Sequence, residues 1–290
     1  MTRTVGPPRD PSEAGVLFGP PSAEALELTP AALQRCLHSA VFGHRVFYYP
    51  IIGSTNDRAL ELCAGGEPEG SLVLAEEQTG GRGRRARAWT SRSRLGIYAS
   101  LVLRPGAPAP RAPLFTFIAA VSVAGALREA CSLAARIKWP NDVVIGARKI
   151  AGILGEVRGS SPEVRELVMG LGVNVNQASE DFPPELRSRA TSARIESGVV
   201  VDRAPILALI LEGFERRYAR LLRGEASDLL REWESLSAIP TGGSLVVEGP
   251  AGRSEGTLRG VDEEGALLLA DPGGDQVRVP FGEIVQCLWP

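Results

Sequence analysis

The segment VVIGARKIAGIL, residues 143–154, sets strong limits on the fold of this chain. Two runs rich in Val, Ile and Leu flank Gly146 and Ala147, and a short glycine-containing connection of this kind is typical of a β-hairpin. A hairpin joins neighbouring strands in antiparallel order, which an all-parallel sheet does not contain. The segment therefore favours an α+β fold over a Rossmann fold.

The rest of the chain mixes strand-like and helix-like stretches. Further strands are expected over residues 45–53, 71–78, 95–104 and 165–176, which are apolar runs of strand length. Helices are expected over residues 29–42, 54–66, 114–127 and 202–223, with Thr29 and either Ser54 or Thr55 as N-caps and Gly65 as a left-handed stop. Together these elements predict a mixed, largely antiparallel sheet with helices packed on one face.

The composition changes along the chain. After Pro240, short β-runs alternate with Gly, Pro and Asp turns, which predicts a small β-barrel. We therefore expect a disordered leader at 1–28, a catalytic domain at 29–236 and a C-terminal barrel at 237–290. The apolar run 114–127 is shorter than the roughly 20 residues needed to cross a bilayer, so we expect a buried helix and no membrane span.

Charge and cysteine usage narrow the class of protein. The formal net charge is only −2, which gives no sign of a nucleic-acid-coating protein. The four cysteines are far apart and form no C-x-x-C pair, so we expect a cytoplasmic protein rather than a disulfide scaffold. With His38 and His44 as the only histidines, no protein-bound transition metal is expected.

Against this near-neutral background, GGRGRRARAW, residues 80–89, gathers four arginines among glycines. Arginine forks match phosphate oxygens, and glycines let the backbone approach an anion closely. The loop joins two expected strands. Taken alone, the pattern fits a mobile basic loop, a nucleic-acid patch or an RG-type RNA-binding segment as well as it fits a phosphate-binding enzyme loop.

Five motifs in a fixed order decide between these interpretations. They are GSTNDRA (53–59), EEQTGGRGRRARAW (76–89), KWPNDV (138–143), RKIAGILGE (148–156) and GLGVNVNQ (170–177). In this order they resemble the biotin protein ligases, and GTLRGVDEEGALLL (256–269) extends the likeness towards the C-terminus. The resemblance implies a catalytic domain of the class II synthetase-like type, followed by an SH3-like β-barrel.

The resemblance also implies a two-step reaction. Biotin and ATP, with Mg²⁺, would give biotinyl-5'-AMP, and a lysine of the biotin carboxyl carrier protein of acetyl-CoA carboxylase, or of a related carboxylase, would then take the biotinyl group. The chemistry suits the arginine loop. A carboxylate and a triphosphate at about 4 Å repel each other by roughly 4 kcal/mol at an effective dielectric constant of about 20, so fixed cations must offset that repulsion.

The resemblance assigns roles to particular residues. Lys149 and Arg84 are the expected catalytic residues, with Lys149 between the biotin carboxylate and the α-phosphate. The expected biotin-binding set is Ser54, Thr55, Asn56, Gln78, Arg82, Gly83, Arg84, Trp89, Lys149 and Gly152. The expected ATP and adenylate set is Arg82, Arg84, Arg85, Lys138, Lys149 and Asn174.

Several of these positions have a second interpretation. Ser54 and Thr55 also suit a helix cap, and Gly152 also suits a β-bulge. Asn141 and Asp142 fit either a turn or the orientation of Mg²⁺. Core packing better explains Trp139.

The tip of the arginine loop carries two further expectations. Arg85 and Arg87 are the weaker candidates of the loop, and both are expected to be solvated. Ala86 stands where the family often has glycine, and we expect a backbone there that tolerates alanine, since positive φ would cost about 1 kcal/mol.

Three rival functions are weaker. A lipoate or octanoate ligase or transferase of the related fold handles an apolar chain, which leaves the polar cluster of Ser54, Asn56 and Gln78 unexplained. A biotin-dependent repressor needs a DNA-binding domain, for which the stretch before Arg45 is too short, so no nucleic-acid partner is expected. A pure interaction module leaves Lys149 and the loop without a role. Monomer and homodimer are both compatible with the sequence.

Overall fold

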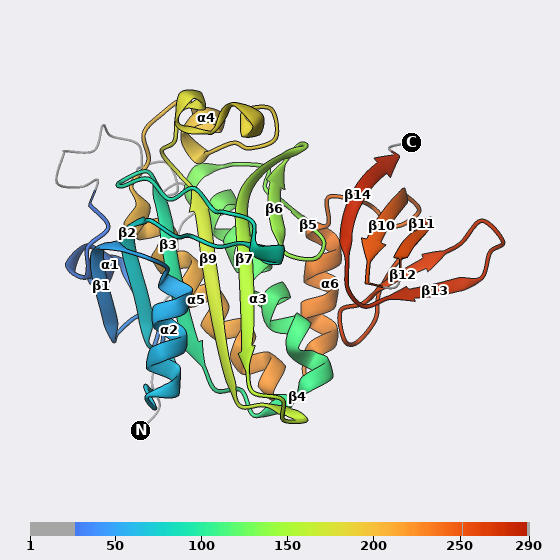
Figure 1. Cartoon of the computed structure of the whole chain (residues 1–290), viewed down its shortest axis with the longest axis horizontal. Helices are drawn as coiled ribbons and strands as arrows, with labels where there is room; N and C mark the ends of the chain where they lie inside the picture. The colour runs from blue at the N-terminus through green and yellow to red at the C-terminus, as the bar shows by residue number, and fades with distance from the viewer. Residues whose placement is uncertain (1–26, 251, 289–290) are drawn as a thin grey trace, which may run out of the picture.

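The computed structural model describes residues 27–250 and 252–288. A seven-stranded sheet forms the centre of the larger part (Figure 1). Its order is β1 (Val46–Ile52), β2 (Leu72–Gln78), β3 (Gly96–Leu103), β9 (Glu166–Asn174), β7 (Arg148–Arg158), β6 (Asp142–Ile145) and β5 (Arg136–Lys138). Only the β1–β2 pair of this sheet is parallel. The predicted α+β class with a largely antiparallel sheet is confirmed, including the β6–β7 hairpin.

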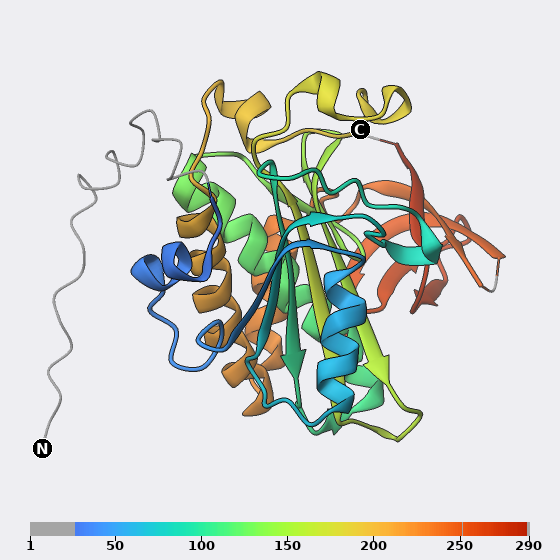
Figure 2. The same ribbon diagram turned by 60° about the vertical axis from the view of Figure 1, so that its left-hand side comes forward.

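Helices cover both faces of this sheet. The long helices α3 (Ala112–Cys131) and α5 (Arg203–Leu222) pack against each other on one face, beside α6 (Ala226–Leu236). The opposite face carries α2 (Thr55–Ala64), whose Ala59, Leu62 and Cys63 form a separate small core with β2, β3 and β9 (Figure 2). The prediction of helices on one face was therefore wrong. Strand β3 shows the reason. All of its residues are buried, whereas a strand with one face in solvent would bury only every second residue.

Helix α3 supplies the largest share of the buried helical surface. It is long and apolar enough to cross a membrane by length and composition, yet 78% of its most apolar window is buried inside the fold. The helix runs beyond the predicted 114–127 at both ends, and Ala130 and Cys131 in its last turn are buried as well. This burial is the pattern of a core helix.

Two helix ends differ from the prediction. Helix α1 (Pro30–Cys36) has Thr29 as its N-cap, as expected, but ends well before residue 42, and Val41 is exposed. The backbone N–H groups of residues 40–42 instead donate to the Glu215 carboxylate. In α2 the N-cap is Ser54, and the left-handed residue after the helix is Gly66 at φ 86°, not Gly65.

The C-terminal part is a five-stranded antiparallel sheet that fits the predicted SH3-like barrel. Its strands are β10 (Ser244–Gly249), β11 (Gly252–Val261), β12 (Leu267–Ala270), β13 (Gln276–Val279) and β14 (Glu283–Leu288). Its apolar residues share one core with α3 and α6. The Trp139 indole N–H donates to the carbonyl of Gly265 at 3.1 Å, so Trp139 is the core residue that the sequence predicted.

Short elements complete the fold. They are β4 (Ala107–Pro108), β8 (Glu163–Val164), α4 (Ala193–Ser197) and four 3₁₀ turns at Arg84–Ala86, Ala109–Arg111, Ser179–Asp181 and Pro184–Leu186. Leu28, at the end of the expected leader, is buried, and its N–H donates to the buried carboxylate of Glu76. Residues 1–26, which make up most of that leader, lie outside the described residues.

Candidate active site

One cleft of about 720 Å³ brings together every site residue that the sequence predicted. Its walls come from the N-terminus of α2, the loop between β2 and β3, strands β5, β7 and β9, and the start of β14. The predicted residues that line it are Ser54, Thr55, Asn56, Gln78, Arg82, Gly83, Arg84, Arg85, Trp89, Lys138, Lys149, Gly152 and Asn174. Segments almost 230 residues apart in sequence therefore form a single site.

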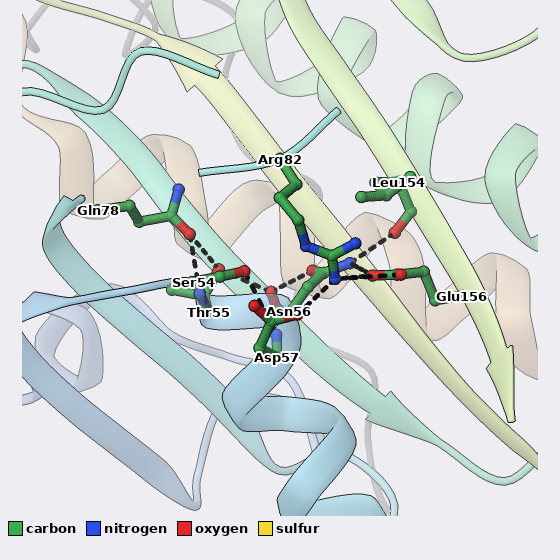
Figure 3. Close-up of polar contacts among 9 residues, drawn as sticks. Ser54, Thr55, Asn56, Asp57, Gln78, Arg82, Leu154 and Glu156 are labelled. Atoms are coloured by element: carbon green, nitrogen blue, oxygen red, sulfur yellow. Dashed lines mark hydrogen bonds and ion pairs between the residues drawn. The ribbon is translucent and has the colours of Figure 1, made fainter. Parts of the chain in front are cut away.

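Hydrogen-bonding side chains from α2 and β2 line one part of the cleft, beside the charged Arg82 (Figure 3). The backbone N–H and the hydroxyl of Thr55 both donate to Gln78 Oε1, at 2.8 and 3.0 Å. Gln78 Nε2 in turn donates to Ser91 Oγ at 2.8 Å. Ser54 Oγ accepts the N–H of Asp57 as the cap of α2, so its expected structural role is confirmed. This network fixes the orientation of the hydroxyl and amide groups at the cleft wall.

Asn56 is buried beneath this part of the cleft and is held on all sides. Its amide donates to Glu156 Oε2 at 2.7 Å and to the Leu154 carbonyl at 3.3 Å, while Oδ1 accepts from Ser100 Oγ at 2.6 Å. Both amide hydrogens thus have protein acceptors. Sequence reasoning missed Ser100, although a serine inside the apolar run of β3 was a usable signal.

Arg82 begins the arginine loop and is neutralised there. Its guanidinium lies 2.5 Å from Asp57 Oδ1 and 3.1 Å from Glu156 Oε2 (Figure 3). Burial acts to lower the pKa of Arg82, but the charges of Glu156 and Asp57 outweigh it and raise that pKa. The loop is therefore anchored to α2 and β7 at this end.

The loop tip contacts the C-terminal barrel. Arg87 forms a two-pronged ion pair with Glu283, at 2.8 and 2.7 Å, and Arg85 lies 3.4 Å from the same carboxylate. The Arg87 side chain is nevertheless 64% exposed and that of Arg85 46% exposed, so both stay solvated, as expected, while they contact the barrel. Sequence reasoning also missed Glu283, because nothing in the local pattern relates residues that are 196 positions apart.

The tip is also strained. Arg85 and Ala86 adopt φ of 55° and 57°, a left-handed conformation that side chains disfavour. The expectation that the backbone at Ala86 tolerates alanine was wrong. Each such residue costs on the order of 1 kcal/mol relative to glycine.

Arg84 carries the one guanidinium of the loop tip that points to neutral partners. It donates to Asn141 Oδ1 and to the Gly282 carbonyl, both at 3.1 Å, and within residues 27–250 and 252–288 it forms no ion pair. Burial, and then the charge of Arg85, lowers its pKa. Lys138, on β5, also lines the cleft and forms no ion pair within 4.0 Å among the described residues, although its charge acts on Glu283. The cleft thus holds cationic charge that is not neutralised, as an anion site requires.

Lys149 lies at the start of β7, facing the loop. Its Nζ is 2.6 Å from Asp142 Oδ1 and 5.3 Å from the centre of the Trp89 ring. Its backbone is fixed on the other side too, since its N–H donates to Arg189 O and its carbonyl accepts from Thr191 N. The backbone of Lys149 is thus held by two hydrogen bonds, and its ammonium group is held by Asp142.

Two glycines, Gly152 and Gly172, allow the Trp89 ring to pack against the strands of the cleft. A Cβ on Gly152 would come within 3.0 Å of both the Lys149 ammonium and the Trp89 ring, and one on Gly172 within 2.6 Å of that ring. The bulge between β6 and β7 falls between Val143 and Val144, not at Gly152. Close approach of neighbouring groups therefore explains Gly152 better than a bulge does.

Asn174 supports the floor of the cleft. Its side-chain amide is buried and donates to Thr191 O at 3.0 Å. Thr191 belongs to the segment that holds the Lys149 backbone. The structure thus connects Asn174 to the position of Lys149 through that segment.

The fold and this cleft define a member of a ligase family, and family models agree. The model described as "Biotin/lipoate A/B protein ligase family" matches residues 48–174, and "Biotin protein ligase C terminal domain" matches residues 245–285. The chain belongs to the biotin protein ligase family.

Individual relatives cover most of the chain. It is 39% identical to the bifunctional ligase/repressor BirA of Bacillus spizizenii, over 86% of this chain and 76% of that protein. The biotin–[acetyl-CoA-carboxylase] ligase of Paracoccus denitrificans is 38% identical, over 80% and 96%. Among solved structures, the biotin protein ligase of Aquifex aeolicus in complex with biotin and ATP superposes with a TM-score of 0.73 at 27% identity, over 83% of this chain and 97% of that one.

Proposed function

We propose that this chain is an ATP-dependent biotin–protein ligase. It activates biotin as biotinyl-5'-AMP and transfers the biotinyl group to one lysine of a biotin carboxyl carrier domain, such as that of acetyl-CoA carboxylase. One observation carries the proposal, namely that a single cleft is lined both by neutral hydrogen-bonding side chains, such as Thr55 and Gln78, and by a cation without an ion pair among the described residues, Arg84. Biotin has the matching polarity, with a ureido ring at one end and a carboxylate at the other.

The neutral side chains suit the ureido group, which has both donors and acceptors. Hydroxyl and amide side chains can serve either function, and Ser54, Thr55 and Gln78 present them in a fixed orientation. The Trp89 ring packs closely on Gly172, where a Cβ would lie 2.6 Å from it, and gives the cleft an apolar wall for the aliphatic part of biotin.

The cationic side chains suit adenylation. A biotin carboxylate oxygen attacks the α-phosphorus of ATP, the bond to the bridging β-phosphate oxygen breaks, and pyrophosphate leaves. Lys149 and Arg84 offset the repulsion between the two anions, and Lys138 faces the departing phosphates. Mg²⁺ enters with ATP, and Asp142 offers an oxygen ligand of the type that Mg²⁺ prefers.

Transfer completes the reaction. The neutral ε-amine of the carrier lysine attacks the acyl carbon, the bond to the phosphate oxygen breaks, and AMP leaves while the amine loses a proton. Asn56 and Asn174 act by holding the walls, since their amides bond to neighbouring backbone.

The proposal includes the organisation and location of the protein. Residues 29–236 form the catalytic domain and residues 237–290 the C-terminal domain. The thiols of Cys36, Cys63, Cys131 and Cys287 are free, which suits a reducing cytoplasm.

The test is incubation of the chain with biotin, MgATP and a purified carrier domain, followed by mass measurement of the carrier. We expect a gain of one biotinyl group, absent when the acceptor lysine is replaced by arginine. A gain from lipoate but not from biotin would instead identify a lipoate ligase, and no gain from either would contradict the proposal.

A further inference from the structure

The arginine loop and the C-terminal barrel meet at one corner of the barrel. Five hydrogen bonds connect them. Arg87 and Arg85 reach the Glu283 carboxylate, Arg85 also reaches the Glu248 carbonyl, and Arg84 reaches the Gly282 carbonyl. The two outer arginines thus bind the barrel through charge, whereas Arg84 binds it only through a backbone carbonyl.

The corner that carries Glu283 is tightly built. Glu283 pairs with Glu248 in the β10–β14 ladder, and the next residue, Ile284, is buried in the core. A Cβ on Gly282 would lie 2.6 Å from Val247 Cγ1 and 2.8 Å from the Glu248 carbonyl, so this backbone is packed directly on β10. The carboxylate is therefore presented from a fixed position.

The barrel is itself fixed to the catalytic domain. The Trp139 N–H donates to Gly265 at 3.1 Å, and Gly265 packs beside Phe117 and Pro113 at the start of α3. Phe117 stacks on Trp233 of α6 at 4.6 Å between ring centres. Glu283 is thus attached to the same framework that carries Lys138 and Lys149.

The loop tip needs an external support. Arg85 and Ala86 are both at positive φ, and within the tip the backbone is closed by the bonds from Gly83 N to Arg87 O and from Arg87 N to Arg84 O. Residues in such conformations persist where the surroundings hold them. The Glu283 contacts fall on Arg85 and Arg87, the residues on either side of Ala86.

We propose that Glu283 is a positioning residue for the adenylation reaction. Its carboxylate holds Arg85 and Arg87, and the loop tip so held places the Arg84 guanidinium on the cleft wall beside Asn141. The inference rests on the proposed function. Within it, the outer arginines anchor the loop and Arg84 faces the phosphate, which gives the C-terminal barrel a direct part in the chemistry.

The charge state of the carboxylate supports this arrangement. The hydrogen bonds from Arg87 lower the pKa of Glu283 from its ordinary value of 4.5, and burial only partly opposes them. The ion pair is therefore complete at neutral pH.

The test compares Glu283→Gln, Arg87→Gln and the double variant with the wild type. For Glu283→Gln we expect release of bound biotinyl-5'-AMP to accelerate about tenfold, the equivalent of 1.4 kcal/mol, with KM for ATP raised and the melting temperature lowered only slightly. Arg87→Gln should have a similar effect on adenylate release. The double variant should add little to either single change, because both single changes remove the Arg87–Glu283 ion pair. The control is Glu255→Gln, an exposed glutamate of the same barrel.

Two further measurements keep the inference separate from the proposed function. Without ligands, hydrogen exchange at the Gly83 N–H should accelerate in Glu283→Gln, whatever the substrate is. Exchanging the charges, Glu283→Arg with Arg87→Glu, should restore protection and adenylate retention only in part, because Arg85 then faces an arginine. If the wild type forms adenylate while Glu283→Gln retains it equally well and keeps the loop protected, this inference is overturned alone. If the wild type forms no adenylate, the proposed function itself fails.

Discussion

The ammonium group of Lys149 lies 2.6 Å from a carboxylate oxygen of Asp142, across the β6–β7 hairpin. The pair holds a cation at the centre of the cleft, within 5.3 Å of the centre of the Trp89 ring. Cations placed in advance of the reaction stabilise charge without reorganisation. In the adenylation proposed above, Lys149 is such a cation.

Lys149→Ala should lower the rate of adenylate formation by at least about 10²–10³-fold, because it removes a cation from the reacting centre. The melting temperature should change little, since no core volume is lost. Quenched-flow measurement of biotinyl-5'-AMP tests this. Arg148→Ala is the matched control, because Arg148 is on the same hairpin but pairs with Glu196. Equal adenylation by Lys149→Ala and wild type would remove the assignment.

Gly172→Ala should raise KM for biotin, because the added methyl group would lie 2.6 Å from the Trp89 ring and displace it. The control is Gly125→Ala in α3, where a Cβ meets nothing within 4 Å. That change should leave KM unaltered and stabilise the fold by up to about 1 kcal/mol. Steady-state kinetics and thermal unfolding distinguish the two variants. An unaltered KM in Gly172→Ala would show that Trp89 does not border the biotin site.

Ala86→Gly should relieve strain at the loop tip, since Ala86 has φ 57°. Glycine there should stabilise the closed tip by up to about 1 kcal/mol, and exchange at the Gly83 N–H should slow by up to about fivefold. Ala88→Gly, at a position without positive φ, should instead speed exchange. If both glycine variants speed exchange equally, the left-handed conformation at Ala86 is not the one populated in solution.

The pH dependence of the Glu283 ion pair follows from the lowered pKa. A carboxylate whose pKa is lower in the folded state stabilises that state above its ordinary pKa of 4.5, and the contribution disappears as pH falls through the lowered value. NMR titration of Glu283 should give a pKa below 4.5 that rises towards 4.5 in Arg87→Gln. No change in that variant would show that Arg87 does not hold the carboxylate.

Local patterns were sufficient for most of the elements. The hairpin at Gly146, the N-caps Thr29 and Ser54 and the apolar stripe of α5 were all predictable, because each depends on neighbours within one turn or one hairpin. Where tertiary contacts compete, prediction failed. Helix α1 ends early because Glu215, on α5, takes the backbone N–H groups that a longer helix would have used.

The site followed the same division. Its residues could be listed from five motifs, yet the partners of those residues could not. Ser100 and Glu283 lie in none of the motifs, and Glu156 ends one of them without an assigned role. Each acquires its role only when the fold brings it to Asn56, Arg82 or Arg87. The left-handed Ala86 did have a signal, the glycine that the family often has there, but the expectation favoured a backbone that tolerates alanine.

Formation of the adenylate without any carrier tests the central claim most directly. The wild-type chain is mixed with biotin and α-labelled MgATP in a single turnover, and the bound products are separated after quenching. We predict about one biotinyl-5'-AMP and one pyrophosphate per chain, dependent on biotin and reduced to background in Lys149→Ala. Label release that does not require biotin, or an equal yield from Lys149→Ala, would contradict the account.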